Sequence, residues 1–197
     1  MVTKFLKMNK YLSVAIACLI TLAGYGQKDD VSLEDIWRDY KFYSQSIGGL
    51  RSMNDGINYT TLEKTESGMS IIKHSYSDEN KHEILVDAVD LKIDEKQIAI
   101  GDYSFSADEK KLLIATDKKS IYRYSSKSHY YVFDIATKKL TKLTNGNRQM
   151  YATFSPSGNK VAFVRDNNLF YTDLNTGKEV AITTDGKKNE IINGCLL

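Results

Sequence analysis

The sequence predicts an all-β fold, a partial β-propeller of about three to four four-stranded blades. The first observation is a repeat, because residues 103–115 read YSFSADEKKLLIA and residues 152–164 read ATFSPSGNKVAFV. The second is its continuation: YYVFDIATKKLTKLT at 130–144 resembles FYTDLNTGKEVAITT at 170–184. The third is a fainter copy that begins with SMNDGINYTTL at 52–62. Repeats of about 40–50 residues with four short strands each are typical of propeller blades.

The repetition has a physical reason, since one four-stranded sheet cannot bury both of its faces and must stack against copies of itself. Each copy contains an inner strand, a polar turn, a second strand, a hairpin through a D-x-x-T-G/K-K stretch and an outer strand. Turn signals at Gly56, Glu109 and Gly158 mark the three copies. An ordinary antiparallel sandwich with similar turns is the alternative, and two aligned half-blades in succession favour the propeller.

Residues 1–26 have the layout of a secretory signal peptide, with three lysines before an apolar run at 11–23 and small residues after it. The run is shorter than the roughly 20 residues that cross a bilayer, which favours cleavage before Gln27 over an uncleaved anchor. Lipidation at Cys18 is a further alternative, disfavoured because apolar residues continue beyond it. We therefore expect an exported protein, periplasmic or extracellular, with no membrane segment after cleavage.

Charge and cysteine content narrow the function classes. The leader carries three lysines and no acid, so the net charge of +2 for the whole chain becomes −1 for residues 27–197. This balance does not indicate a basic face for nucleic acid or anionic lipid. Cys195 is the single cysteine after cleavage, so the mature chain has no internal disulfide and no cysteine-based zinc motif.

Residues 27–50 are predicted to form an N-terminal helix and a lead-in strand. SLEDIWRDYKF at 32–42 has apolar residues at helical spacing behind Ser32, a candidate N-cap. Residues 51–194 are assigned to the partial propeller and 195–197 to an aberrant tail. The copy at 103–144 contains ten extra residues between its halves, which favours a projecting hairpin. The aromatic residues expected to crowd around Arg123 in that hairpin are Tyr122, Tyr124, Tyr130, Tyr131 and Phe133.

The search for chemistry predicts no catalytic residue, no metal site and no cofactor. Hydrolysis by an activated serine on the α/β-hydrolase plan requires a G-x-S-x-G turn, and no such pentapeptide occurs in the 197 residues. The three histidines, His74, His82 and His129, lie among polar residues and are not expected to act in catalysis. Acid pairs such as Asp94-Glu95 lie in turn-like segments and lack calcium-loop spacing. No glycine-rich phosphate loop is present.

The ordered set VSLEDIW, SMNDGINYT, YRYSSKSHYYVFD, FSPSGNKVAFVRDNNLFY and IINGCLL resembles the propeller domain of dipeptidyl peptidase IV, a serine peptidase family of the prolyl oligopeptidase type. The resemblance implies an eight-bladed propeller above a hydrolase domain that releases X-Pro or X-Ala dipeptides, with peptide N-termini as partners. It also implies that an arginine in a Y-R-H/Y-S loop contacts the substrate's backbone carbonyl. Arg123 matches that position, and a guanidinium suits the role because it is always charged and offers several donors.

The family pattern continues after I-I-N-G with a D-W-x-Y-E-E stretch, whereas Cys-Leu-Leu follows Gly194 here. We therefore expect a truncated propeller that is inactive by itself. We also expect it to self-associate, because a partial arc would leave two open blade faces of apolar side chains. The alternative is an exported propeller-type module for protein binding or assembly. The DNA downstream of the stop codon discriminates between them, since truncation predicts that it encodes D-W-x-Y-E-E.

Overall fold

The structure, a computed structural model, describes residues 30–44, 49–78, 80–123 and 125–194. The predicted signal peptide, both cysteines and the tail 195–197 lie outside these residues. The chain divides into two compact units, Met1–Ser46 and Ile47–Leu197, which are described separately. The domain boundaries that the sequence suggests after residues 26, 50 and 194 stay predictions. Within the described ranges, no helix has the length and hydropathy that crossing a membrane requires.

The described part of the first unit contains the helix α2 (Leu33–Trp37), which begins as predicted with Ser32 as N-cap. The Asp35 amide donates to Ser32 Oγ at 3.1 Å, and the Ser32 amide donates to Asp35 Oδ2 at 3.0 Å. A hydrogen bond from Lys41, followed by those from Ser32, lowers the pKa of Asp35 to about 2. The helix is shorter than the predicted 32–42, because Tyr40 adopts a φ of 48° and no residue of the helix is buried to support a longer one.

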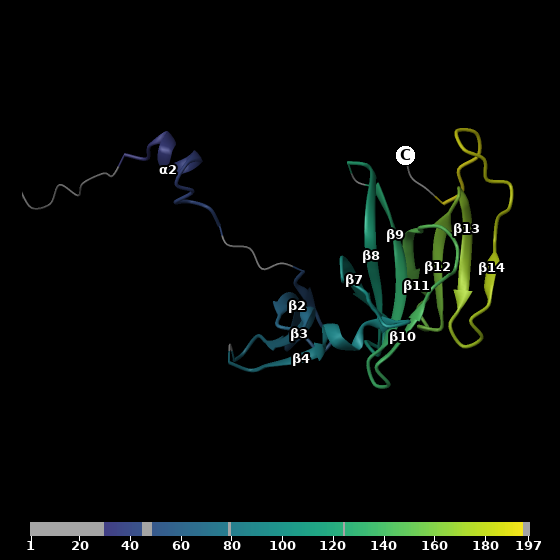
Figure 1. Ribbon diagram of the computed structural model, residues 1–197, viewed down its shortest axis with the longest axis horizontal. Helices are drawn as coiled ribbons and strands as arrows, with labels where there is room; N and C mark the ends of the chain where they lie inside the picture. The colour runs from purple at the N-terminus through teal and green to yellow at the C-terminus, as the bar shows by residue number, and fades with distance from the viewer. Residues whose placement is uncertain (1–29, 45–48, 79, 124, 195–197) are drawn as a thin grey trace, which may run out of the picture. The chain divides into compact units, whose positions relative to one another are not determined.

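The second unit contains three four-stranded antiparallel blades, each with its strands in sequential order (Figure 1). Blade 1 consists of β1 (Arg51–Ser52), β2 (Asn58–Thr65), β3 (Gly68–Ser75) and β4 (His82–Val86). Blade 2 consists of β7 (Asp102–Phe105), β8 (Lys111–Tyr122), β9 (Ser125–Asp134) and β10 (Lys139–Lys142). Blade 3 consists of β11 (Met150–Phe154), β12 (Lys160–Arg165), β13 (Asn168–Asp173) and β14 (Glu179–Ala181). The predicted partial propeller is confirmed.

A short segment links blades 1 and 2. It contains the 3-10 helix η1 (Ala88–Asp90) and a two-stranded sheet of β5 (Lys92–Ile93) and β6 (Lys96–Gln97). Asp94 and Glu95 form the turn between these two strands with φ values of 49° and 64°. This acid pair is therefore a turn, as predicted, and the two positive φ values match the type of turn that two-residue hairpins favour.

The turn after the first strand of blades 2 and 3 explains the repeated serine. In blade 2 the Lys111 amide donates to Ser106 Oγ at 3.0 Å, and in blade 3 the Lys160 amide donates to Ser155 Oγ at 3.1 Å. The two serines thus satisfy the same backbone donor at the start of the second strand.

The three predicted turn signals share one backbone conformation. Gly56, Glu109 and Gly158 have φ values of 69°, 55° and 68°. Glycine is favoured at such a left-handed position because it has no Cβ, and Glu109 adopts the same conformation without that freedom. Glu109 accepts a hydrogen bond from the Asn54 amide of blade 1 at 2.7 Å, which ties neighbouring turns together.

The hairpin between the third and outer strands is also repeated. Asp134 accepts from the Thr137 amide at 2.9 Å, and Asp173 accepts from the Thr176 amide at 3.1 Å. The aspartate of the D-x-x-T stretch therefore closes the turn in both blades, a common role of that residue.

Two apolar cores lie between the blades. The core between blades 1 and 2 includes Ile71, Leu112, Ile114 and Phe133, all at most 1% exposed, and Tyr103. The core between blades 2 and 3 consists of Leu113, Val132, Leu143, Val161 and Phe163. Neighbouring residues of β8 point to opposite faces, so blade 2 is buried on both sides and the sequence from Leu112 to Ala115 is continuously apolar.

The face of blade 1 that points away from blade 2 differs from the apolar face that the sequence analysis expected. Tyr59 stacks on His74 with ring centroids 5.0 Å apart, and His74 Nε2 lies 2.8 Å from Glu63 Oε1. Thr61 and Ile72 are paired on the same face. Blade 1 therefore presents a mixed polar and aromatic surface there.

Candidate functional site

The hairpin of β8 and β9 is much longer than the corresponding hairpin of blade 3. The strands β8 and β9 have 12 and 10 residues, whereas β12 and β13 have 6 each, and this difference accounts for the ten extra residues in the sequence. The pair Thr116↔His129 in blade 2 corresponds to Arg165↔Asn168 in blade 3, where the shorter hairpin turns. The predicted projecting hairpin is confirmed, and it extends a sheet rather than forming a loop (Figure 1).

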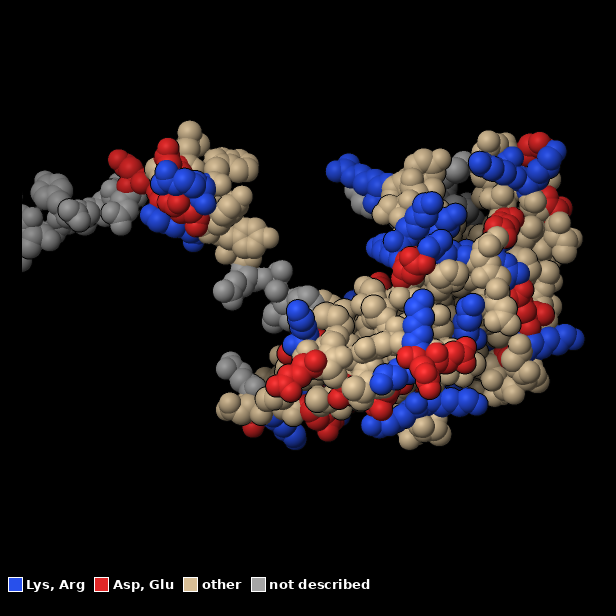
Figure 2. Space-filling view, in the orientation of Figure 1, with Lys and Arg blue, Asp and Glu red and all other residues tan. Residues whose placement is uncertain are grey.

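The projecting half of this hairpin is cationic. Residues 117–122 are all exposed, and residues 117–128 contain four basic side chains and one acidic one. On the face drawn in Figure 2, Lys and Arg side chains gather over this part of the hairpin. The whole chain has a net charge of only +2, so the basic character is a local property of this end of blade 2.

Arg123 lies in the turn at the tip of the hairpin, directly after β8. The prediction that aromatic residues cluster around Arg123 is only partly correct. Tyr122 is its neighbour and is 76% exposed. Tyr131 and Phe133 pair with Ile114 and Leu112 at the packed end of β8, several residues from the tip, because strand pairing keeps their positions along the hairpin fixed. Tyr130 is near Ala115 in the same part of the sheet.

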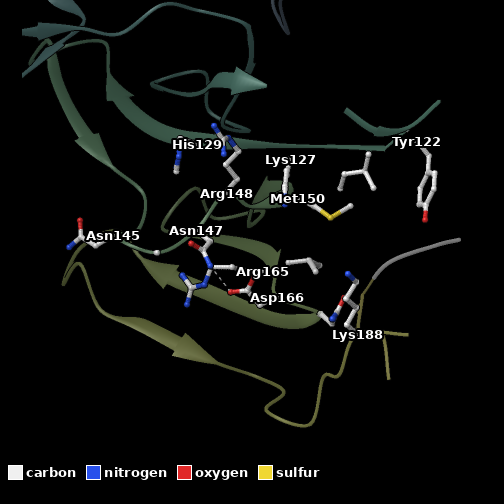
Figure 3. Close-up of a pocket in the computed structure, with 14 residues that line it drawn as sticks. Tyr122, Lys127, His129, Asn145, Asn147, Arg148, Met150, Arg165, Asp166 and Lys188 are labelled. Atoms are coloured by element: carbon white, nitrogen blue, oxygen red, sulfur yellow. Dashed lines mark hydrogen bonds between the residues drawn. The ribbon is translucent and has the colours of Figure 1, made fainter. Parts of the chain in front are cut away.

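A pocket of about 900 Å³ lies between the hairpin and the adjoining loops and strands of blade 3 (Figure 3). Ile121, Tyr122, Lys127 and His129 of the hairpin line one side. The lining residues outside the hairpin are Asn145, Gly146, Asn147, Arg148, Met150, Val164, Arg165, Asp166, Asn167 and Lys188. Its volume falls within the range of small-molecule sites.

Arg148 fastens the hairpin to the loop that leads into blade 3. Its Nε donates to the backbone oxygen of Asp117 at 3.0 Å, and its guanidinium also forms an ion pair with the Asp117 carboxylate. Asp117 has a φ of 52° and lies where the register of β8 and β9 shifts between Thr116 and Lys119. Such bulges bend a strand, so the Arg148 contact holds the bend that forms one wall of the pocket.

Arg165 forms the best-connected ion pair of the pocket. Its guanidinium donates to Glu179 Oε1 at 2.5 Å and Oε2 at 2.8 Å, and it lies over the Phe170 ring at 4.3 Å. Thr144 donates to the same carboxylate and accepts from Arg165 at 2.8 Å. The hydrogen bonds from Arg165, ahead of those from Thr144, lower the pKa of Glu179. Arg165 and Glu179 therefore neutralise each other, and their ion pair has a structural role beside the pocket.

His129 lines the pocket, and its Nε2 is 3.9 Å from Asp117 Oδ2. Its Nδ1 is buried without a hydrogen-bond partner. Desolvation, followed by the positive charges of Arg148 and Lys142, lowers its pKa, so the ring is neutral near pH 7. His74 and His82 lie in blade 1, with ring centroids 6.0 Å apart. In the described part of the chain, no three His, Cys, Asp or Glu side chains gather as metal ligands would.

The sequence analysis predicted Arg123 as a site residue, and among the residues that line the pocket it named only Tyr122 and His129. Lys127, Arg148 and Lys188 come from three segments separated by turns and strands, and only Lys127 lies in a stretch that the sequence analysis used, YRYSSKSHYYVFD. The only sequence signal for this pocket was the excess of basic residues in the ten extra residues of the hairpin. Contacts between blades cannot be deduced from residue spacing.

Comparison with known proteins identifies relatives of the blades. Residues 106–196 match the family described as the dipeptidyl peptidase IV (DPP IV) N-terminal region. A probable dipeptidyl-aminopeptidase B of Colletotrichum graminicola is 40% identical over 95 residues, 46% of this chain. That of Emericella nidulans is 31% identical over 135 residues, 67% of this chain. The crystal structure of Porphyromonas gingivalis dipeptidyl peptidase 4 superimposes with a TM-score of 0.66 and 32% identity over 81% of this chain.

The match covers a small part of each relative. It spans 10% of the Colletotrichum protein, 15% of the Emericella protein and 22% of the Porphyromonas chain. The activity and substrates of the whole relatives are therefore not transferred by the similarity alone.

Proposed function

Residues 106–196 belong to the N-terminal region of the dipeptidyl peptidase IV family, and on that premise we propose that this chain supplies the part of a propeller that holds a peptide's N-terminal end. The parent activity is serine-type release of X-Pro or X-Ala dipeptides. In this proposal Arg123 contacts the peptide backbone from the tip of the β8–β9 hairpin.

One observation carries the proposal: the ten residues that distinguish blade 2 from blade 3 extend a sheet beyond the packed core and end in the turn that contains Arg123. The extension adds nothing to the described apolar cores, because residues 117–122 are exposed. A stiff, paired extension presents a side chain with less loss of conformational entropy than a free loop would.

Arg123 is tested by titrating the purified chain with an amidated Ile-Pro peptide and following the binding by NMR chemical shifts. We expect Arg123→Ala to weaken binding about three- to tenfold, the effect of one or two lost hydrogen bonds. Lys139→Ala at the start of β10 is the matched control, since it removes a cation at the other end of blade 2. Equal affinities for the Arg123 variant and the parent chain would refute the assignment.

We further propose that the 197 residues do not release dipeptides by themselves. The absence of a G-x-S-x-G turn from the printed sequence supports this. A Gly-Pro chromogenic amide incubated with the purified chain should give no more product than a boiled sample. Turnover above that level would contradict the proposal.

Export is part of the same proposal, supported by the charge and hydropathy pattern of residues 1–26. Expression in a Gram-negative host, fractionation and N-terminal sequencing should give a periplasmic product that begins at Gln27. A cytoplasmic product that retains Met1 would argue against it.

A further inference from the structure

Two of the four cations that line the pocket are already paired. Arg148 is bound to Asp117, and Arg165 is bound to Glu179. The remaining acid of the pocket, Asp166, accepts a hydrogen bond from Asn147 Nδ2 at 3.2 Å. The acidic groups around the pocket are therefore engaged with partners of their own.

The other two cations have no such partner. Within the described ranges, no carboxylate oxygen lies within 4.0 Å of the ammonium groups of Lys127 or Lys188. Lys127 in β9 is partly buried, whereas Lys188 is exposed. Figure 3 shows Lys127 on the hairpin side of the pocket and Lys188 on the opposite side. A partly desolvated ammonium group favours a nearby anion, because water screens it incompletely there.

We infer that this pocket binds the side-chain carboxylate of an acidic residue in a peptide. The inference rests on the proposed function, because Arg123 at the adjoining hairpin tip brings the peptide to the pocket mouth, where Tyr122 lies. Carboxylates beside Lys127 and Lys188 gain charge-assisted contacts without breaking either existing ion pair. The chain thus prefers peptides that carry Asp or Glu close to their N-terminal end.

A carboxylate fits the pocket better than a phosphate group does. Asp166 lies within the pocket and repels a doubly charged anion more strongly than a singly charged one. The pocket also lacks a glycine-rich turn that would direct several backbone amides at phosphate oxygens.

The experiment uses three labelled peptides of equal length with the same Ile-Pro start. The first contains glutamates and an amidated C-terminus, the second has glutamines in their place, and the third has glutamines and a free C-terminal carboxylate. Fluorescence anisotropy with the purified chain at low salt should give about three- to tenfold tighter binding of the first peptide than of the second, as expected for two partly exposed ion pairs. This preference should shrink between about 0.02 and 0.3 M NaCl, because salt screens the pairing.

Lys127→Gln should remove most of the preference for glutamate, and Lys139→Gln should leave it intact. Circular dichroism establishes that both variants are folded, and the salt dependence of the unaltered chain tests the preference without any variant. Equal binding of the glutamate and glutamine peptides, with Arg123→Ala still weakening both, overturns the inference and leaves the proposed function standing. An equal gain from the free C-terminus overturns the assignment to a side chain, and no binding of any peptide overturns both proposals.

Discussion

The β8–β9 hairpin of blade 2 and the β12–β13 hairpin of blade 3 start from the same sequence pattern and end differently. Their packed halves begin in the same register, with Lys111↔Asp134 and Lys160↔Asp173, and Leu112 and Val161 are both fully buried. Beyond the pairs Thr116↔His129 and Arg165↔Asn168, blade 3 turns within two residues while blade 2 continues as an exposed, cationic extension. The comparison teaches that the two blades are alike where their strands are buried, whereas the candidate site lies on the exposed extension.

The largest difference in stability is expected between the packed part and the projecting part of the β8–β9 hairpin. Phe133→Ala removes a side chain that is 1% exposed, and we expect a loss of about 3–5 kcal/mol in the free energy of unfolding. Tyr122→Ala in the extension removes an aromatic side chain that is 76% exposed and should change it by less than about 0.5 kcal/mol. Urea denaturation followed by circular dichroism measures both. Equal losses would show that the extension belongs to the core.

The second prediction concerns the ion pair at the turning point of the short hairpin. Glu179→Gln weakens the contact with Arg165 and should cost about 1.5–3 kcal/mol at neutral pH. Since the pKa of Glu179 is lowered in the folded state from 4.5, its contribution is full above pH 4.5 and is lost as the pH falls through the folded pKa.

The pH dependence is measured by urea denaturation between neutral pH and pH 3. The stability of the Gln variant should fall less steeply with acid than that of the parent chain. Glu190→Gln is the control, because its pair with Lys187 has both side chains more than half exposed and should contribute little. Parallel acid profiles for parent and Glu179→Gln would remove Glu179 as the cause.

The third prediction tests whether the equivalent serine turns of blades 2 and 3 contribute equally to stability. Ser106→Ala and Ser155→Ala each remove the hydroxyl that accepts from a strand amide, and each should lower the free energy of unfolding by about 1 kcal/mol. Thermal and urea unfolding of both variants test this. A loss confined to one of them would mean that the two turns are equivalent in sequence but not in energy.

The largest deletion should have only a small effect on stability. Residues 118–127 are replaced by Asn-Gly, a two-residue turn that keeps Asp117 for its contact with Arg148 and Ser128 for its pairing with Gln149. Because the removed strand of β8 is exposed, we expect a change of less than about 1 kcal/mol, together with loss of the preference for acidic peptides. A loss comparable to that of Phe133→Ala would place the extension among the supports of the fold.

Much of the fold follows from the sequence alone. Local patterns identified the three blades, the turns at Gly56, Glu109 and Gly158, the N-cap at Ser32 and the projecting hairpin, because each depends on residues close together in the chain. The helix length was wrong, since the contacts that would extend α2 are not local. The outer face of blade 1 is more polar than expected, because alternation does not tell which face meets a neighbour.

What the sequence determined by itself is the repeat, and with it the wedge-shaped stacking of sheets and the position of Arg123 at a hairpin tip. What only the tertiary structure decided is the pocket. Lys127, Arg148 and Lys188 meet there because blade 3 stacks on blade 2, and the pairing of Arg148 with Asp117 and of Arg165 with Glu179 determines which cations are left to bind an anion. Charge pairing depends on distances of a few ångströms between segments far apart in the chain, and such distances are properties of the packed fold.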